Sequence, residues 1–148
     1  MASGMATLAG FVREEDSPDH NRRARDLAEQ GRAAYPDSIG GRQCLSTVKS
    51  IEAPQYAVHA MASDGPDRRS IGVDYKNLRA LHFRAWPMDL KKQIENTDEW
   101  DVFPSWRVIE KFVSGSKPAA EWSVELPETT DFEIHRQFVT PPMREPGF

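Results

Sequence analysis

Proline and glycine interrupt this sequence at short intervals. Its 148 residues include 11 prolines and nine glycines. Proline lacks a backbone N–H donor and glycine weakens the interior of a helix or strand, so the individual elements are expected to be short. A bundle of long helices is therefore not expected, and the length of the chain suits a single domain.

The clearest helix signal lies in residues 17–34. Ser17 is a typical N-cap, Pro18 suits the first helical position, and Asp19 interacts favourably with the positive end of the helix dipole. A proline follows this stretch, and the glycine pair after it predicts a loop. We expect one N-terminal helix in this region, preceded by an N-terminal arm over residues 1–16.

β-Branched and aromatic residues indicate that a sheet forms most of the remaining chain. The turn signal Asp64-Gly65-Pro66 predicts a hairpin between the two strands that flank it. In the C-terminal part, apolar and polar residues alternate as they do in a half-buried strand. The predicted strands cover residues 45–51, 55–62, 69–75, 122–126 and 132–139.

Two segments fit either a strand or a helix. In residues 78–86 some apolar positions alternate as in a strand, whereas others are one helical turn apart. Residues 104–113 are rich in β-branched and aromatic side chains, but a proline and a glycine bracket them as at the ends of a helix. A short helix is expected between the two segments, after Pro87.

Together these elements predict an α+β fold. An N-terminal helix is followed by a mainly antiparallel sheet, which one or two short helices interrupt. This domain covers residues 17–139. An extended, proline-rich C-terminal arm is expected over residues 140–148, because Pro141 and Pro142 cannot donate hydrogen bonds to a sheet.

The charge distribution disfavours nucleic acid as a partner. The net charge is −4, and residues 95–133 hold ten acidic residues against three basic ones. Phosphate contacts are supplied by Lys and Arg, so this part of the chain is not expected to bind nucleic acid.

The sequence has the features of a soluble protein in a reducing compartment. No basic region precedes the apolar patch near the start, so no signal peptide is expected. No stretch approaches the ~20 apolar residues that span a bilayer. Cys44 is the one cysteine, which excludes an internal disulfide. It matches no thiol-enzyme signature, and we expect it to be buried as a small apolar group.

Three histidines are the candidates for catalysis. If the strand predictions hold, His59, His82 and His135 lie on sheet faces, where Asp74 or Glu133 could act as a carboxylate partner. Such a group would suit a small hydrolase or isomerase. Close ligand pairs such as H-x-x-x-H or C-x-x-C are missing from the sequence, so neither a metal nor a cofactor is expected.

The favoured hypothesis is a non-enzymatic structural or accessory subunit that acts through protein–protein contact, with the enzyme as the alternative. A stiff proline-rich arm can dock on a partner at low entropic cost. Tryptophan in an acidic loop is typical of an interface. A viral or organellar multi-subunit complex would fit this function, with other subunits or a second copy as the partner. The expected interface residues are Trp100, Pro141, Pro142, Met143, Arg144 and Phe148.

Overall fold

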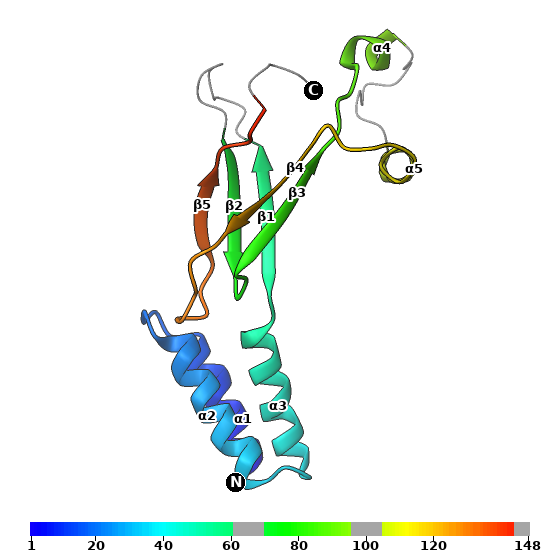
Figure 1. The fold of residues 1–148 in the computed structure, drawn as a ribbon. Coiled ribbons are helices and arrows are strands. Elements are labelled where there is room, and N and C mark those ends of the chain that lie inside the picture. The colour runs from blue at the N-terminus through cyan, green and yellow to red at the C-terminus, as the bar shows by residue number, and fades with distance from the viewer. Residues whose placement is uncertain (61–69, 96–104, 144–148) are drawn as a thin grey trace.

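The computed structural model describes residues 1–60, 70–95 and 105–143, and its helices and strands occupy separate regions of the molecule (Figure 1). Three helices form one end of an elongated molecule, the strands form its middle, and two short helices lie at the far end (Figure 1). The helices are α1 (Ala2–Arg13), α2 (His20–Ala34), α3 (Ile39–Glu52), α4 (Leu90–Glu95) and α5 (Trp106–Gly115). The strands are β1 (Gln55–Ala60), β2 (Ile71–Lys76), β3 (Ala80–Ala85), β4 (Ala120–Glu125) and β5 (His135–Val139). The predicted α+β class is thus confirmed.

Helices α1, α2 and α3 pack against one another as a small bundle. Alanines fill much of its core, because Ala9, Ala24 and Ala28 are fully buried beside Cys44 and Ile51. Such small side chains allow the helix backbones to approach one another while the interior stays densely packed. Helix α2 confirms the predicted N-terminal helix, but it begins at His20 with Asp19 as its N-cap, so Ser17 and Pro18 precede it.

The N-terminal region holds more helix than the sequence predicts. Residues 1–16, expected to be an arm, contain α1. The glycine pair, expected to lie in a loop, belongs to the first turn of α3, where the Ser38 hydroxyl accepts a hydrogen bond from the Gly41 N–H at 2.9 Å. Close packing requires glycine in this turn, since a Cβ at Gly40 would lie only 2.7 Å from the Cβ of Ala2 in α1.

The strand predicted over residues 45–51 is wrong, because these residues lie within α3. Cys44, Val48 and Ile51 are buried on one side of this helix, at the spacing of three and four residues that a helix requires. Burial of this face against α1 and α2 outweighs the β propensity of Val and Ile.

The strands form two antiparallel sheets that share a core. One sheet has the order β1-β2-β5, and the other pairs β3 with β4. The pairing of Val58 with Val73 confirms that the two predicted strands pair antiparallel, whereas the predicted turn Asp64-Gly65-Pro66 lies outside the described residues. Side chains from both sheets meet in the core; its buried members are Val73, Tyr75, Leu126 and Val139.

The two ambiguous segments take different forms. Strand β3 falls within residues 78–86, and its Phe83 stacks on Trp122 of β4 with ring centroids 5.1 Å apart. Helix α5 occupies most of residues 104–113, and α4 is the short helix expected after Pro87. The last two predicted strands correspond to β4 and β5, but β5 begins only at His135, because the left-handed backbone of Phe132 interrupts the extended chain before it.

The predicted C-terminal arm begins where β5 ends, at Val139. Residues 140–143 lie outside any helix or strand, and the rest of the arm lies outside the described residues. In the described ranges, none of the helices is long and apolar enough to cross a membrane.

Polar side chains join the helical bundle to the sheets. Asn77 follows β2 with a left-handed φ of 55°, a conformation that Asn adopts more readily than most residues. Its side chain donates to the carbonyl oxygen of Ile51 in α3 at 2.9 Å, and its backbone N–H donates to the hydroxyl of Thr129 at 2.8 Å. Asn77 therefore ties the end of α3 to the turn after β2 and to the segment between β4 and β5.

Candidate functional site

The three candidate histidines do not come together. His82 lies on β3 in the two-stranded sheet, where its Nδ1 is 2.6 Å from the hydroxyl of Ser123. His59 and His135 belong to the three-stranded sheet but lie on opposite faces. Asp74, which contacts His59, pairs in register with Arg136, and the residue after Asp74 pairs with His135.

On one face of the three-stranded sheet, His59, Asp74 and Arg136 form a line across all three strands. Arg136 donates two hydrogen bonds to the Asp74 carboxylate, from Nε at 2.6 Å and from Nη2 at 2.8 Å. His59 Nε2 lies 3.0 Å from the second of these oxygens. Because the hydrogen bonds from Arg136 favour the ionised form, the pKa of Asp74 falls from 3.8 to about 2. A carboxylate with so low a pKa is a weak proton acceptor and therefore a poor general base. The contacts of Asp74 instead connect the three strands of the sheet.

Replacing Arg136 with Gln should raise the pKa of Asp74 from about 2 towards 3.8. In the wild type the pKa is lower in the folded than in the unfolded state. The carboxylate therefore stabilises the fold above about pH 4, and this contribution is lost as the pH falls towards 2. An NMR titration of the side-chain carboxyl carbon measures the shift directly. His59→Gln is the matched control and should move this pKa less, since Arg136 is the main cause. An unchanged titration of Asp74 in Arg136→Gln would contradict the assignment.

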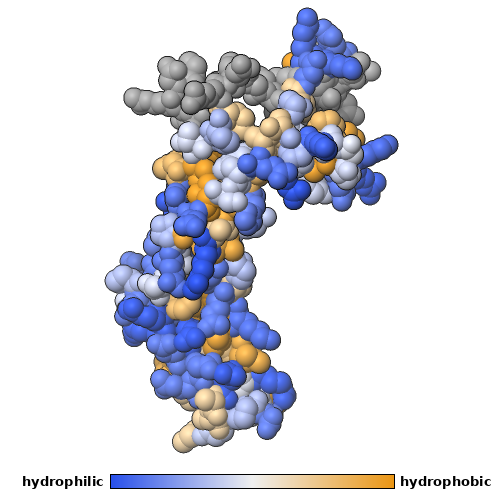
Figure 2. Space-filling model, viewed as in Figure 1, coloured by the Kyte–Doolittle hydropathy of each residue, from blue (hydrophilic) through white to orange (hydrophobic). Residues whose placement is uncertain are grey.

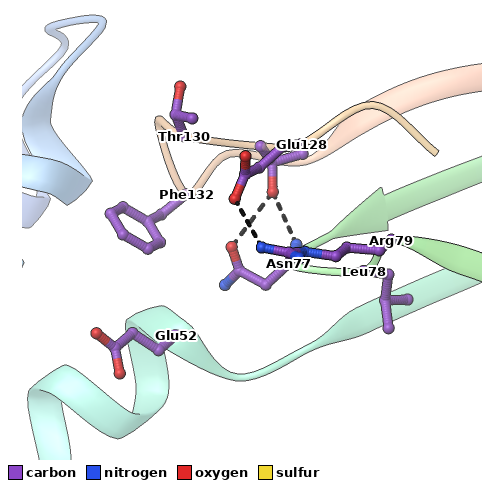
Figure 3. Close-up of a pocket in the computed structure, with 8 residues that line it drawn as sticks. Glu52, Asn77, Leu78, Arg79, Glu128, Thr130 and Phe132 are labelled. Atoms are coloured by element: carbon purple, nitrogen blue, oxygen red, sulfur yellow. Dashed lines mark hydrogen bonds and ion pairs between the residues drawn. The ribbon is translucent and has the colours of Figure 1, made fainter.

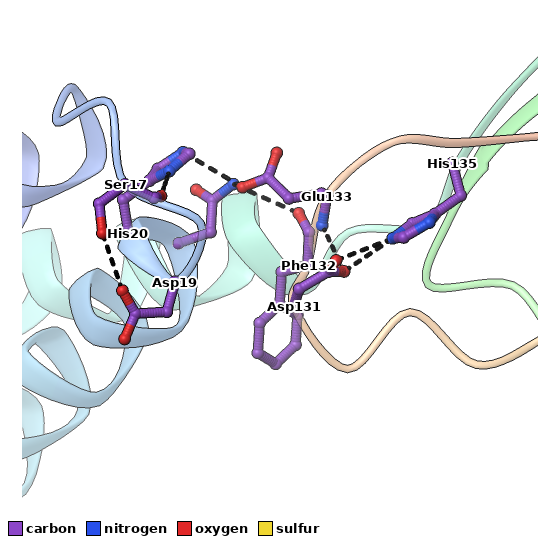
Figure 4. Close-up of polar contacts among 8 residues, drawn as sticks. Ser17, Asp19, His20, Asp131, Phe132, Glu133 and His135 are labelled. Carbon is purple, nitrogen blue, oxygen red and sulfur yellow. Dashed lines mark hydrogen bonds and ion pairs between the residues drawn. The ribbon is translucent and has the colours of Figure 1, made fainter.

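Glu133, the second candidate carboxylate, contacts the helical bundle and none of the sheet histidines named above (Figure 4). Its Oε1 accepts a hydrogen bond from the Asn21 side chain at 2.6 Å and lies 3.2 Å from His20 Nε2. The other ring nitrogen of His20 is 2.6 Å from the carbonyl oxygen of Ser17. His135 instead contacts Asp131 at 2.9 Å. Both Asn21 and His20 belong to α2, so Glu133 is a second connection between the bundle and the sheets.

The sequence analysis did not predict that His20 and Asn21 contact Glu133. Asn21 and Glu133 are 112 positions apart in the chain, and no periodicity in either segment indicates that they meet. In the structure the left-handed backbone of Phe132, with a φ of 59°, turns the chain just before Glu133.

Cys44 is fully buried in the bundle core, as expected. Burial raises the pKa of its thiol, and its Sγ lies 3.8 Å from the carbonyl oxygen of Ala2. A raised pKa disfavours the thiolate that a nucleophile requires. Cys44 therefore acts as a small apolar group in the packing of α1 and α2 on α3.

An open groove of about 420 Å³ lies where the bundle meets the sheets (Figure 3). Its lining includes Glu52, Arg79 and Glu128, whose charges are already engaged. Arg79 lies 3.3 Å from Glu128, and Glu52 accepts a hydrogen bond from Arg25 at 2.7 Å. Because these charged side chains already pair with one another or with Arg25, the groove is poorly suited to an ionic ligand. Across residues 1–60, 70–95 and 105–143, no three His, Cys, Asp or Glu side chains lie close enough to share a metal ion.

Helix α5 exposes several large apolar side chains. Every residue of this helix is exposed or half-buried, although its sequence is strongly amphipathic. Trp106 is 73% exposed, Val108 56% and Phe112 48%. Arg107 and Lys111 lie on the opposite, polar side at helical spacing. A tryptophan and a phenylalanine are thus presented to the surface of a short helix at the end of the molecule farthest from α1.

The interface residues predicted from the sequence are placed only in part. Met143 is 39% exposed, Pro142 is exposed and Pro141 is half-buried. The others lie outside the described residues; they are Trp100, Arg144 and Phe148.

Three comparisons with known proteins bear on identity. No protein-family model, no curated protein and no solved structure matches this chain.

Proposed function

We propose that the protein is a non-enzymatic structural or accessory subunit that acts through protein–protein contact in a larger assembly. The observation that carries the proposal is α5, whose large apolar side chains face solvent. Burial of apolar surface contributes about 25 cal/mol per Å², and a contiguous exposed apolar surface marks an interaction site more often than a free one. Hydrophobic residues also lie at the surface near α5 in Figure 2, beside hydrophilic ones.

The chemistry of α5 favours a protein partner. Trp106 and Phe112 are of the kind that anchors an interface, because aromatic side chains bury much area and lose little entropy. The polar side carries Arg107, Glu110 and Lys111, a mixed set that suits the polar rim of such an interface. Ile109 and Val113 are half-buried and lie between Trp106 and Phe112 on the apolar face of the helix, so the more exposed aromatic side chains flank them.

The arrangement of the histidines gives less support to a hydrolase or isomerase. His82 is in a different sheet from His59 and His135, and Asp74 is held by Arg136. The proposed setting is a multi-subunit complex, of a viral or organellar kind, in which α5 contacts a neighbouring subunit.

The double substitution Trp106→Ser and Phe112→Ser should release the protein from its assembly. Each aromatic anchor of an interface typically contributes about 2 kcal/mol or more, so the double variant should bind at least about 100-fold more weakly. Native sizing of gentle extracts from the source cells measures the effect. The wild-type chain should elute far above its own 16.8 kDa, and the variant should elute near that mass.

The matched control is Arg107→Ser with Lys111→Ser, which alters the polar side of the same helix. This control should stay in the large complex. A wild-type chain that elutes alone, or a double aromatic variant that stays in the complex, would refute the proposed function.

A further inference from the structure

Helix α1 has an exposed face without charge. Gly4, Thr7, Leu8 and Phe11 are exposed and follow the spacing of one helical face; we call them the α1 stripe. Leu8 is 51% exposed and Phe11 64%. The opposite side of the helix packs into the bundle through Ala2, Ala9 and Val12. An apolar face of this kind on a helix that already packs on its other side is typical of a helix–helix contact.

The α1 stripe is complementary to itself when two copies run antiparallel. Gly4 and Phe11 are equally far from the centre of the stripe, so Gly4 of one copy would lie opposite Phe11 of the other. In the described part of the chain, no atom lies within 4 Å of a Cβ placed on Gly4, which leaves room for a phenyl ring. At the centre of the contact, Thr7 of each copy would lie opposite Leu8 of the other. A parallel pair would instead place Phe11 on Phe11 and leave a void between the glycines.

The charges at the two ends of α1 also favour the antiparallel pair. The first turn of α1 has no acidic side chain, and among the described residues no side chain caps it. Directly after its last turn the chain carries Glu14, Glu15 and Asp16. Glu15 is already paired with Arg23 at 2.7 Å. Antiparallel packing brings the other two carboxylates, Glu14 and Asp16, towards the positive end of the partner's helix dipole, where acidic groups stabilise a helix.

We infer that two copies of this chain associate through the α1 stripe, as an antiparallel and two-fold symmetric contact. Both steric and charge complementarity are satisfied by the chain's own second copy, which is the defining feature of such an isologous interface. The inference goes beyond the proposed function, because α1 and α5 lie at opposite ends of the molecule (Figure 1). A helix of 12 residues is about 18 Å long, so the contact is small and the dimer is expected to be weak.

Cross-linking between two single-cysteine variants tests the direction of the contact. Purified Gly4→Cys and Phe11→Cys chains, one of them tagged to change its size, are mixed and treated with a short bis-maleimide. We expect the mixed, tagged–untagged product to exceed either self-linked product at least about fivefold. The wild type is the control, because its Cys44 is fully buried and should give little product. Predominant self-linking of Gly4→Cys or of Phe11→Cys would overturn the inference.

Sedimentation equilibrium from about 1 to about 500 µM tests the association itself. The wild type should show a monomer–dimer equilibrium, and Leu8→Glu should weaken it at least about tenfold. Gly10→Ala, off the stripe on the same helix, should leave it unchanged. Circular dichroism confirms that each variant stays folded. A wild type that is monomeric throughout, as expected if a helix of another protein covers the stripe, would overturn the inference but leave the proposed role of α5 intact.

Discussion

Replacing Gly41 with Ala should destabilise the protein by about 2–3 kcal/mol, although alanine favours a helix by about 1 kcal/mol over glycine. A Cβ at Gly41 would overlap the carbonyl oxygen of Tyr35 and lie 2.8 Å from its carbonyl carbon. These are backbone atoms in the tight connection from α2 to α3, so no side-chain rotation relieves the clash. Urea denaturation followed by circular dichroism at 222 nm measures the free energy of unfolding.

Gly10→Ala is the matched control, because Gly10 lies in α1 with no described atom within 4 Å of a Cβ placed on it. It carries the same gain in helix propensity without a clash. We expect it to stabilise the protein by roughly 0.5–1 kcal/mol. Changes of equal sign in the two variants would show that the α2–α3 connection is not as tightly packed as described.

Replacing Ile51 with Ala should cost about 2–5 kcal/mol of unfolding free energy, the usual range for such a truncation in a core. Ile51 has no exposed surface and packs with Val12 of α1 and Ala24 of α2. The neighbouring side chains are fixed by the helices, so the cavity can close only in part. The same denaturation experiment applies, and Ile51→Val should cost an intermediate amount of about 0.5–1.5 kcal/mol.

Ile39 provides the control for this prediction, because it lies at the start of the same helix and is 68% exposed. Ile39→Ala should change the unfolding free energy by no more than about 0.5 kcal/mol. An Ile51→Ala variant as stable as Ile39→Ala would mean that α3 does not pack in the bundle as described.

Local patterns in the sequence identified much of the sheet and one helix correctly. The stretch predicted as the N-terminal helix contains α2, although the N-cap is Asp19 and not Ser17, and two of the β-rich stretches pair as β1 and β2. Alternation of apolar and polar residues located β4, and it located β5 only in part, since that strand begins at His135 and leaves Phe138 57% exposed. In each case the signal is a property of a few neighbouring residues, which is why it can be read without the fold.

The errors fall where packing partners outweigh local preference. The uncharged stretch of α1 has no strong cap, so the sequence suggested an arm, but its small residues are helical because α2 and α3 cover one side. In α3, Val48 and Ile51 suggested a strand from their β propensity. In the structure they are buried together with Cys44, one turn earlier, on one face of a helix. The pair Gly40-Gly41 suggested a loop. In the structure both residues lie in α3, where backbone from α1 and from the end of α2 comes so close that a Cβ would clash with it.

The candidate site shows the same limit. Sequence reasoning named His59, His135, Asp74 and Glu133, and all four have hydrogen-bonding or charged partners in the structure. Which partner each one meets depends on strand register, since adjacent residues of a strand face opposite sides of a sheet. Asp74 therefore binds Arg136 and His59, while His135 on the other face binds Asp131.

By itself the sequence determined the class of the fold and the approximate positions of α2 and of most strands, because these depend on backbone preferences over a few residues. The tertiary structure alone decided that α5 presents Trp106 and Phe112 outward, that Glu133 holds α2, and that the α1 stripe is uncovered. Exposure and long-range contacts depend on how segments pack in three dimensions. The same linear pattern of apolar residues can face the chain's own core or another protein, so the sequence alone does not distinguish the two.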